Sequence, residues 1–191
     1  MMIFFSDKNT PERVRWNDAA SLLGFTQTHH RGSDWMEGRI DNLEIQVFDL
    51  QESAPLLFVE IDDAVSRCLP RFSVQLAGSE GTVFADLEPT LTGDLIFDHH
   101  LDTYARVPSQ MLDFLHLERR DTILRIYDEV LLVHVTHEGM HAGLELPEEW
   151  DPEDLVATVL RSASLTAQVF DHGIPTRGPI ESEKQTTPIG S

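Results

Sequence analysis

Two histidines and a glutamate lie close together in His137-Glu138-Gly139-Met140-His141, which matches the zinc-peptidase pattern H-E-x-x-H. On a helix, residues four apart share a face, so His137 and His141 could hold one zinc ion. Glu138 would then act as general base toward a metal-bound water. A third ligand would come from the acidic residues that follow: Glu145, Glu149, Asp151 or Asp154. A zinc-dependent hydrolase is therefore one function that this pattern admits.

The residues around the motif favour a strand and a loop over that helix. Residues 130–135 are rich in valine and leucine, which favours a strand, and Gly139 would cost a helix up to about 1 kcal/mol. On a strand the two histidines would lie about 13 Å apart, too far for one zinc ion. We therefore expect a polar strand end here, with no metal, cofactor or catalytic residue. The zinc hydrolase using His137, Glu138 and His141 is the alternative.

A second candidate is Asp98-His99-His100, which resembles the signature of DHH-type phosphoesterases, where such residues help to bind a metal pair. Those enzymes are larger two-domain proteins with an aspartate motif near the N-terminus, and nothing around Asp62-Asp63 fits that motif. We expect solvated loop residues, with a surface metal cluster that includes Asp102 as the alternative.

The chain is strongly acidic, with 33 acidic and 14 basic residues and a formal net charge of −19. This charge disfavours nucleic acid and anionic membranes as partners, because both are negatively charged. The single cysteine, Cys68, excludes an internal disulfide and suits a reducing compartment. We expect no signal peptide and no membrane span, and hence a cytoplasmic protein.

Three helices are predicted from capping residues and apolar periodicity. The first covers residues 11–23, where Pro11 suits the first helical position and Gly24 suits the exit. The second covers residues 108–117. The last begins at Pro152, keeps an apolar stripe for five turns and ends before Gly173.

Strands are predicted between these helices. Residues 33–40 and 43–48 form a hairpin around Asp41-Asn42, and further strands lie at 56–61, 71–77, 82–87 and 103–107. A second hairpin is predicted from 122–127 and 130–137, with its turn at Asp128-Glu129. Because the loops are short, the strands must pair antiparallel. The prediction is one α+β domain over residues 1–173, with helices on one face of a twisted antiparallel sheet and a disordered tail at 174–191.

Three short motifs resemble an uncharacterised bacterial domain family. They are Trp16…Leu23-Gly24, Gly38-Arg39-Ile40-Asp41 and Thr92-Gly93-Asp94…Phe97-Asp98. In that family a tryptophan helix ends in Leu-Gly, a strand carries G-x-[IV]-D-G, and T-G-D-x-x-F-D precedes a helix, a hairpin and a final helix. Asn42 stands where the family has glycine. The resemblance spans residues 13–171 and implies an architecture, without catalytic residues.

The order of elements is also similar to that of the acidic chaperones of type III secretion, which dimerise and bind segments of partner proteins. Fold likeness alone does not establish function. We nevertheless predict a non-catalytic adaptor or regulatory module that binds another protein through a sheet face or edge, and a homodimer is left open. Trp35 and Trp150 are the candidate partner-binding residues, because tryptophan is enriched in interfaces.

Overall fold

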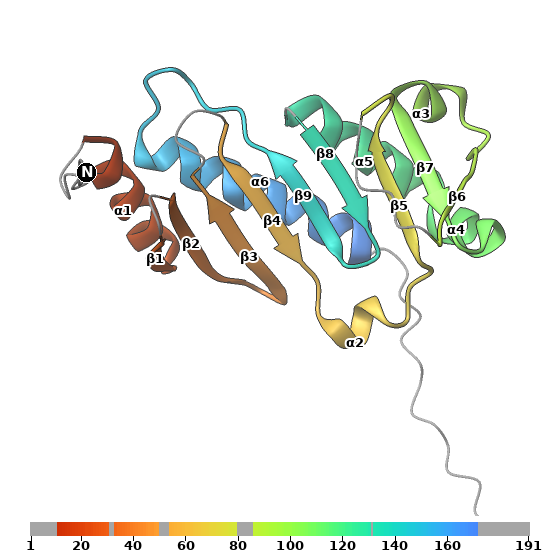
Figure 1. Cartoon of the computed structure of the whole chain (residues 1–191), viewed down its shortest axis with the longest axis horizontal. Coiled ribbons are helices and arrows are strands. Elements are labelled where there is room, and N and C mark those ends of the chain that lie inside the picture. Colours follow the sequence, from red (N-terminus) through yellow and green to blue (C-terminus); the bar gives the residue numbers. More distant parts are fainter. Residues whose placement is uncertain (1–10, 31–32, 50–53, 80–85, 131, 172–191) are drawn as a thin grey trace, which may run out of the picture.

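The chain forms an antiparallel β-sheet with helices packed against one face (Figure 1). The structure is a computed structural model and describes residues 11–30, 33–49, 54–79, 86–130 and 132–171. Within these ranges, nine strands form one sheet in the order β1-β2-β3-β4-β9-β8-β5-β7-β6, and all neighbouring strands are antiparallel. The predicted α+β class is confirmed.

The elements have the following bounds. The strands are β1 Thr26–His30, β2 Ser33–Ile40, β3 Leu43–Phe48, β4 Leu56–Glu60, β5 Phe72–Leu76, β6 Glu88–Pro89, β7 Leu101–Ala105, β8 Leu132–Thr136 and β9 Gly139–Gly143. The helices are α1 Pro11–Leu23, α2 Asp63–Ser66, α3 Leu95–His100, α4 Pro108–Phe114, α5 Leu117–Glu129 and α6 Pro152–Asp171. No helix in the described ranges has both the length and the apolar character that a membrane span requires.

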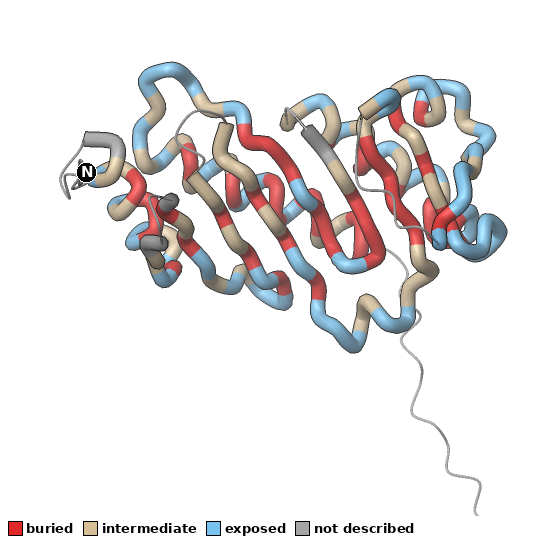
Figure 2. The backbone as a smooth tube through the Cα atoms, in the orientation of Figure 1, coloured by how far each residue is buried: buried red, intermediate tan, exposed pale blue. Residues whose placement is uncertain are grey.

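Successive side chains of a strand point to opposite faces of the sheet, and here one face is covered by helices while the other is open. In β3, Ile45 and Val47 are fully buried, whereas Glu44 and Phe48 point the other way. The covered face meets α6, which contacts β3 and β4, and α5, which contacts β8. Figure 2 shows that β9, in the middle of the sheet, is mostly buried, while burial alternates along β3. We call the face opposite these helices the open face.

The β8–β9 hairpin lies between two strands that are consecutive in the chain. β9 pairs with β4, and β8 pairs with β5. The connection from β4 to β5 passes through the short helix α2, which lies beyond the ends of the central strands, below the sheet in Figure 1. The hairpin therefore joins the β1–β4 meander to β5, β7 and β6.

Residues of the three short motifs have structural roles. A Cβ on Gly38 would overlap the ring of Phe25, so glycine lets that ring pack onto β2. Asp41 has a φ of 54° in the turn between β2 and β3, a conformation that aspartate tolerates. Asp94 caps α3, because its side chain accepts hydrogen bonds from two amides of the first turn. Packing, turn formation and helix capping therefore explain these residue types, and no catalytic role is needed to account for them.

The second predicted hairpin is wrong. Residues 122–127 belong to α5, and the hairpin is formed by β8 and β9, with its turn at His137-Glu138. The isoleucines of this segment favour a strand by propensity. However, Thr122, Ile123 and Ile126 are buried at helical spacing, on an element that packs against α6 and β8. Burial of that stripe outweighs the local β propensity.

The other predicted elements agree more closely with the structure. α1 and the first hairpin have the predicted bounds, and α6 begins at Pro152 as expected. β7 lies earlier in the chain than the predicted strand at 103–107, and the helix predicted at 108–117 ends at Phe114 as α4. The elements β1, β6, β9, α2 and α3 were not predicted. The strand predicted at 82–87 falls mostly outside the described residues, and the tail predicted at 174–191 lies entirely outside them.

Candidate functional site

The H-E-x-x-H residues lie at a turn between two strands and not on a helix. β8 ends at Thr136, His137 and Glu138 form the turn, and β9 begins at Gly139. His137 is buried and Glu138 is exposed, with 3.6 Å between His137 Nε2 and Glu138 Oε1. The helical spacing that would direct His137 and His141 to one zinc ion is therefore missing. Among the described residues, no group of three or more His, Cys, Asp or Glu side chains could hold a metal ion.

The glycine of this motif is required by the sheet. Gly139 has a φ of 147°, which side-chain-bearing residues rarely adopt. A Cβ at this position would overlap the carbonyl oxygen of Val59 on β4. Next to it, the amide of Ile61 donates a hydrogen bond of 3.0 Å to the carbonyl of Glu138. The turn is thus built to lie tightly against β4.

The Asp98-His99-His100 residues do not converge on a common site. Asp98 accepts hydrogen bonds from the amide and hydroxyl of Thr92, at 3.0 and 2.7 Å, and from the amide of Gly93 at 2.9 Å. His99 is exposed. The His100 ring lies 5.6 Å from that of Tyr127. Asp98 therefore stabilises the loop before α3.

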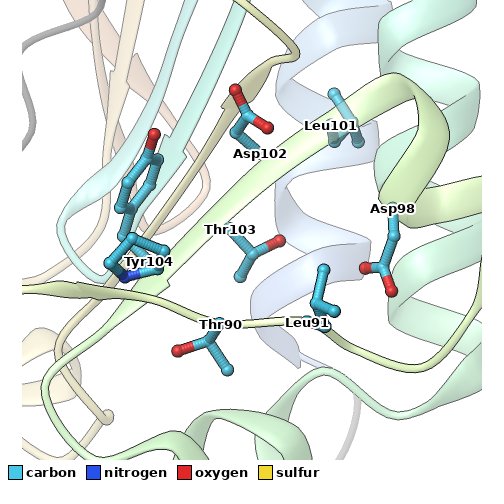
Figure 3. A pocket seen from close by; sticks show the side chains of 8 residues that line it. Thr90, Leu91, Asp98, Leu101, Asp102, Thr103 and Tyr104 are labelled. Carbon is cyan, nitrogen blue, oxygen red and sulfur yellow. The ribbon is translucent and has the colours of Figure 1, made fainter.

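A shallow cavity of about 140 Å³ lies beside this loop (Figure 3). Pro89, Thr90, Leu91, Asp98, Leu101, Asp102, Thr103 and Tyr104 line it. Its two carboxylates do not point toward one another in Figure 3, and Asp102 accepts a hydrogen bond of 2.9 Å from the amide of Gly78. The cavity is smaller than typical ligand sites, which enclose about 300–1,000 Å³. With both carboxylates hydrogen-bonded to the backbone, it offers no acid–base pair.

Aromatic and imidazole rings form a continuous row on the open face. The ring centroids of Trp35 and Phe48 are 6.0 Å apart, and those of Phe48 and Phe58 are 5.1 Å apart. The row continues from Phe58 to His141 at 4.4 Å and from His141 to His134 at 5.7 Å. Each of these side chains is at least partly exposed. We call these five residues the ring row.

Strand register brings the ring row together. Trp35 and Phe48 are direct cross-strand partners on β2 and β3, as are Phe58 and His141 on β4 and β9. His141 is also the direct partner of His134 on β8. Direct partners in an antiparallel pair have Cβ atoms about 4.5–5.5 Å apart, which suits contact between rings. Five neighbouring strands thus contribute one ring each.

Burial favours the neutral forms of the two histidines of the ring row. Burial lowers the pKa of His134, and the neighbouring His141 lowers it further. Burial also lowers the pKa of His141, against an opposing effect of Glu138. The Nε2 of His134 lies 2.8 Å from the hydroxyl of Ser73, which fixes the imidazole on the sheet. Near neutral pH the row therefore presents uncharged rings.

The two predicted partner-binding tryptophans have different surroundings. Trp35 belongs to the ring row on the open face. Trp150 packs edge to face on Trp16, with centroids 6.4 Å apart, and its carbonyl accepts a hydrogen bond of 2.7 Å from Arg15. The guanidinium of Arg15 also lies 4.8 Å from the Trp150 ring centroid. Trp150 thus holds the loop before α6 against α1, and a partner-binding role for it stays a prediction.

Sequence reasoning did not find Phe48, Phe58 and His134. A signal was available for the two phenylalanines, because both occupy outward positions in correctly predicted strands. His141 was considered only as a zinc ligand. Its packing on Phe58 requires the β4–β9 pairing, which no local pattern indicates.

The fold and the ring row together define an α+β sheet module with helices on one face and partly exposed rings on the other. No protein-family model and no curated protein matches the sequence. Among solved structures, the crystal structure of the mycobacterial trehalose monomycolate transport factor A, TtfA, is similar, with a TM-score of 0.56 and 12% sequence identity. The match covers 82% of this chain and 92% of that chain. At this identity, the likeness extends to the fold alone.

Proposed function

We propose that this chain is a non-catalytic module that binds another protein through the ring row. The observation that carries the proposal is the continuous contact of five partly exposed rings across five strands. Contiguous apolar surface of this kind marks interaction sites on soluble proteins. Aromatic side chains also supply much of the binding energy at interfaces. An adaptor or regulatory role fits such a surface.

The surroundings of the candidate catalytic residues support binding over hydrolysis. His137 and Glu138 form a turn, and Gly139 in the same motif serves the contact with β4. The carboxylate of Asp98 already accepts hydrogen bonds from the loop before α3. Metal analysis of protein purified without a histidine tag tests the alternative. One zinc ion per chain, lost in His137→Ala, would favour the hydrolase.

A binding role is also compatible with the name of the structural neighbour, which is a transport factor. A cytoplasmic location remains part of the proposal, and a homodimer is left open. Sedimentation at several protein concentrations measures the oligomeric state.

Site-specific crosslinking in the native host tests the proposed surface. A photoreactive phenylalanine analogue at position 58 should form a covalent adduct with a protein partner. The matched control places the same group at Leu160, which is 45% exposed on α6 in the helical layer. Adducts at position 58 and none at position 160 are expected. Equal adducts at both positions, or none at position 58, would overturn the proposal.

A further inference from the structure

Exposed carboxylates lie along one side of the ring row. Glu44 on β3 and Glu60 on β4 are direct cross-strand partners on the open face, and Glu60 is in turn the partner of Gly139, which follows Glu138. The side chains of Glu44 and Glu138 are 59% and 65% exposed, and Glu60 is also exposed. We call Glu44, Glu60 and Glu138 the acidic flank.

The acidic flank works against the stability of the sheet. Like charges placed directly opposite each other on two strands are destabilising, and Glu44 and Glu60 are such a pair. Arg39 on β2 relieves part of the repulsion, with its Nη1 3.8 Å from Glu44 Oε1. Within the described ranges, Glu60 forms no ion pair. A neutral residue would suit this exposed position better, because the charge of Glu60 only repels that of Glu44.

We infer, on the basis of the proposed function, that the partner segment covering the ring row is a basic amphipathic helix of another protein. Its apolar side would lie on the rings, and its lysine or arginine residues would lie on the side nearest the acidic flank. The charge requirement follows from complementarity, because three exposed carboxylates border the row on that side.

The dimensions of the ring row suit a helix. The row crosses five neighbouring strands, so its four spacings of about 4.8 Å extend over about 19 Å. A helix with a rise of about 1.5 Å per residue covers this length with about 13 residues. Addition of a strand would need an unpaired edge, whereas the strands that carry the row are all paired on both sides. The partner helix would complete a third layer opposite α6.

Other possible binding partners of the ring row are less complementary to the negative charge of the acidic flank. A second copy would bring another chain of net charge −19 to the acidic flank. Anionic membranes and nucleic acids would meet the same repulsion. Residues 174–191 have no basic excess, since Arg177 and Lys184 are balanced by Glu181 and Glu183.

Two designed peptides of about 14 residues test the inference directly. Both have the same leucine face, but one carries lysine and the other glutamate on its polar side. Binding is followed by a fluorophore on Cys68, an exposed cysteine and the only one in the chain. We expect the lysine peptide to bind roughly tenfold more tightly, with an affinity that falls as salt is raised.

Variants locate the binding site. Glu60→Lys should weaken the lysine peptide roughly fivefold without loss of thermal stability, because the substitution removes the repulsion with Glu44. Phe58→Ser should also weaken binding. The matched control is Asp128→Lys, which makes the same change of charge at an exposed position of α5, in the helical layer. This control should leave the affinity for the lysine peptide unchanged.

Five results would overturn the inference. The first is equal binding of the two peptides, and the second is an equal effect of Glu60→Lys and Asp128→Lys. The third is dimerisation that Phe58→Ser abolishes, which would identify a second copy as the occupant. The fourth is binding that appears only after deletion of residues 174–191, which would identify the chain's own tail. A partner crosslinked at position 58 whose binding is unaffected by Glu60→Lys would refute the basic helix and leave the proposed function standing.

Discussion

Replacing Gly139 with alanine tests whether the H-E-x-x-H residues form a turn required by the sheet. The backbone of Gly139 has a φ of 147°, and an added Cβ would overlap the carbonyl of Val59. Such backbone strain costs about 1–3 kcal/mol, and loss of the adjacent hydrogen bond from Ile61 to Glu138 would add about 0.5–1.5 kcal/mol. We therefore expect Gly139→Ala to lower the free energy of unfolding by about 1.5–4.5 kcal/mol.

Urea denaturation followed by circular dichroism measures this loss. The midpoint should fall while the slope with urea stays unchanged, since the same surface is exposed on unfolding. Gly78→Ala is the matched control, because Gly78 has a φ of 72° but open space around its Cβ position. Gly78→Ala should lower the free energy of unfolding by about 1–2 kcal/mol, through the backbone conformation alone. Glu138→Gln should be almost neutral, because Glu138 is exposed.

The difference between the two glycine variants isolates the contact with β4. If Gly139→Ala unfolds at the same urea concentration as Gly78→Ala, then β4 does not constrain the turn and the reasoning fails. A large loss of stability in Glu138→Gln would likewise contradict the structural role assigned here to Gly139.

Three further predictions concern the open face and the loop before α3. Burial lowers the pKa of His134 and of His141, so below about pH 6.5 the unfolded chain binds more protons than the folded chain. The free energy of unfolding should therefore be largest above that pH and fall as the pH drops. Urea titrations between pH 8 and 5 measure this change. Replacing both histidines with asparagine should reduce the pH dependence. Glu60→Gln removes the like-charge pair with Glu44 and should raise the free energy of unfolding by about 0.2–1 kcal/mol, detected as a higher Tm; an unchanged Tm would mean that the repulsion is screened. Asp98→Ala removes the acceptor of three hydrogen bonds and should cost about 2–3 kcal/mol by urea denaturation; a wild-type midpoint would show that the loop does not depend on them.

Elements with strong local signals could be predicted from the sequence. Pro11 and Pro152 begin helices as expected, and Asp41-Asn42 forms the predicted turn. α5 could not be predicted in the same way, because its isoleucines suit a strand and only tertiary burial makes its helical stripe visible. Once α5 was misread as a strand, the turn of the second hairpin was placed too early.

The ring row depends on contacts between distant parts of the chain. The outward positions of Phe48 and Phe58 follow from alternation within each strand. Their continuation to His141 requires β9 to pair with β4, although β5 follows β4 in the chain. That pairing is stabilised by residues such as Met140, which is fully buried and receives a contact of 3.5 Å from the Thr166 hydroxyl on α6. Such long-range packing has no signature within any one segment.

Because the β8–β9 hairpin lies between β4 and β5, the sheet can be completed only after the hairpin has been synthesised. Until residues 132–143 have left the ribosome, β4 and β5 each retain a side of unpaired backbone N–H and C=O groups. Such edges are templates for wrong pairing, and contacts between distant segments form slowly. A nascent chain that stops before Leu132 would therefore consist of two separate half-sheets. The stretch of translation between β5 and β9 is the period in which a holding chaperone would protect this protein most.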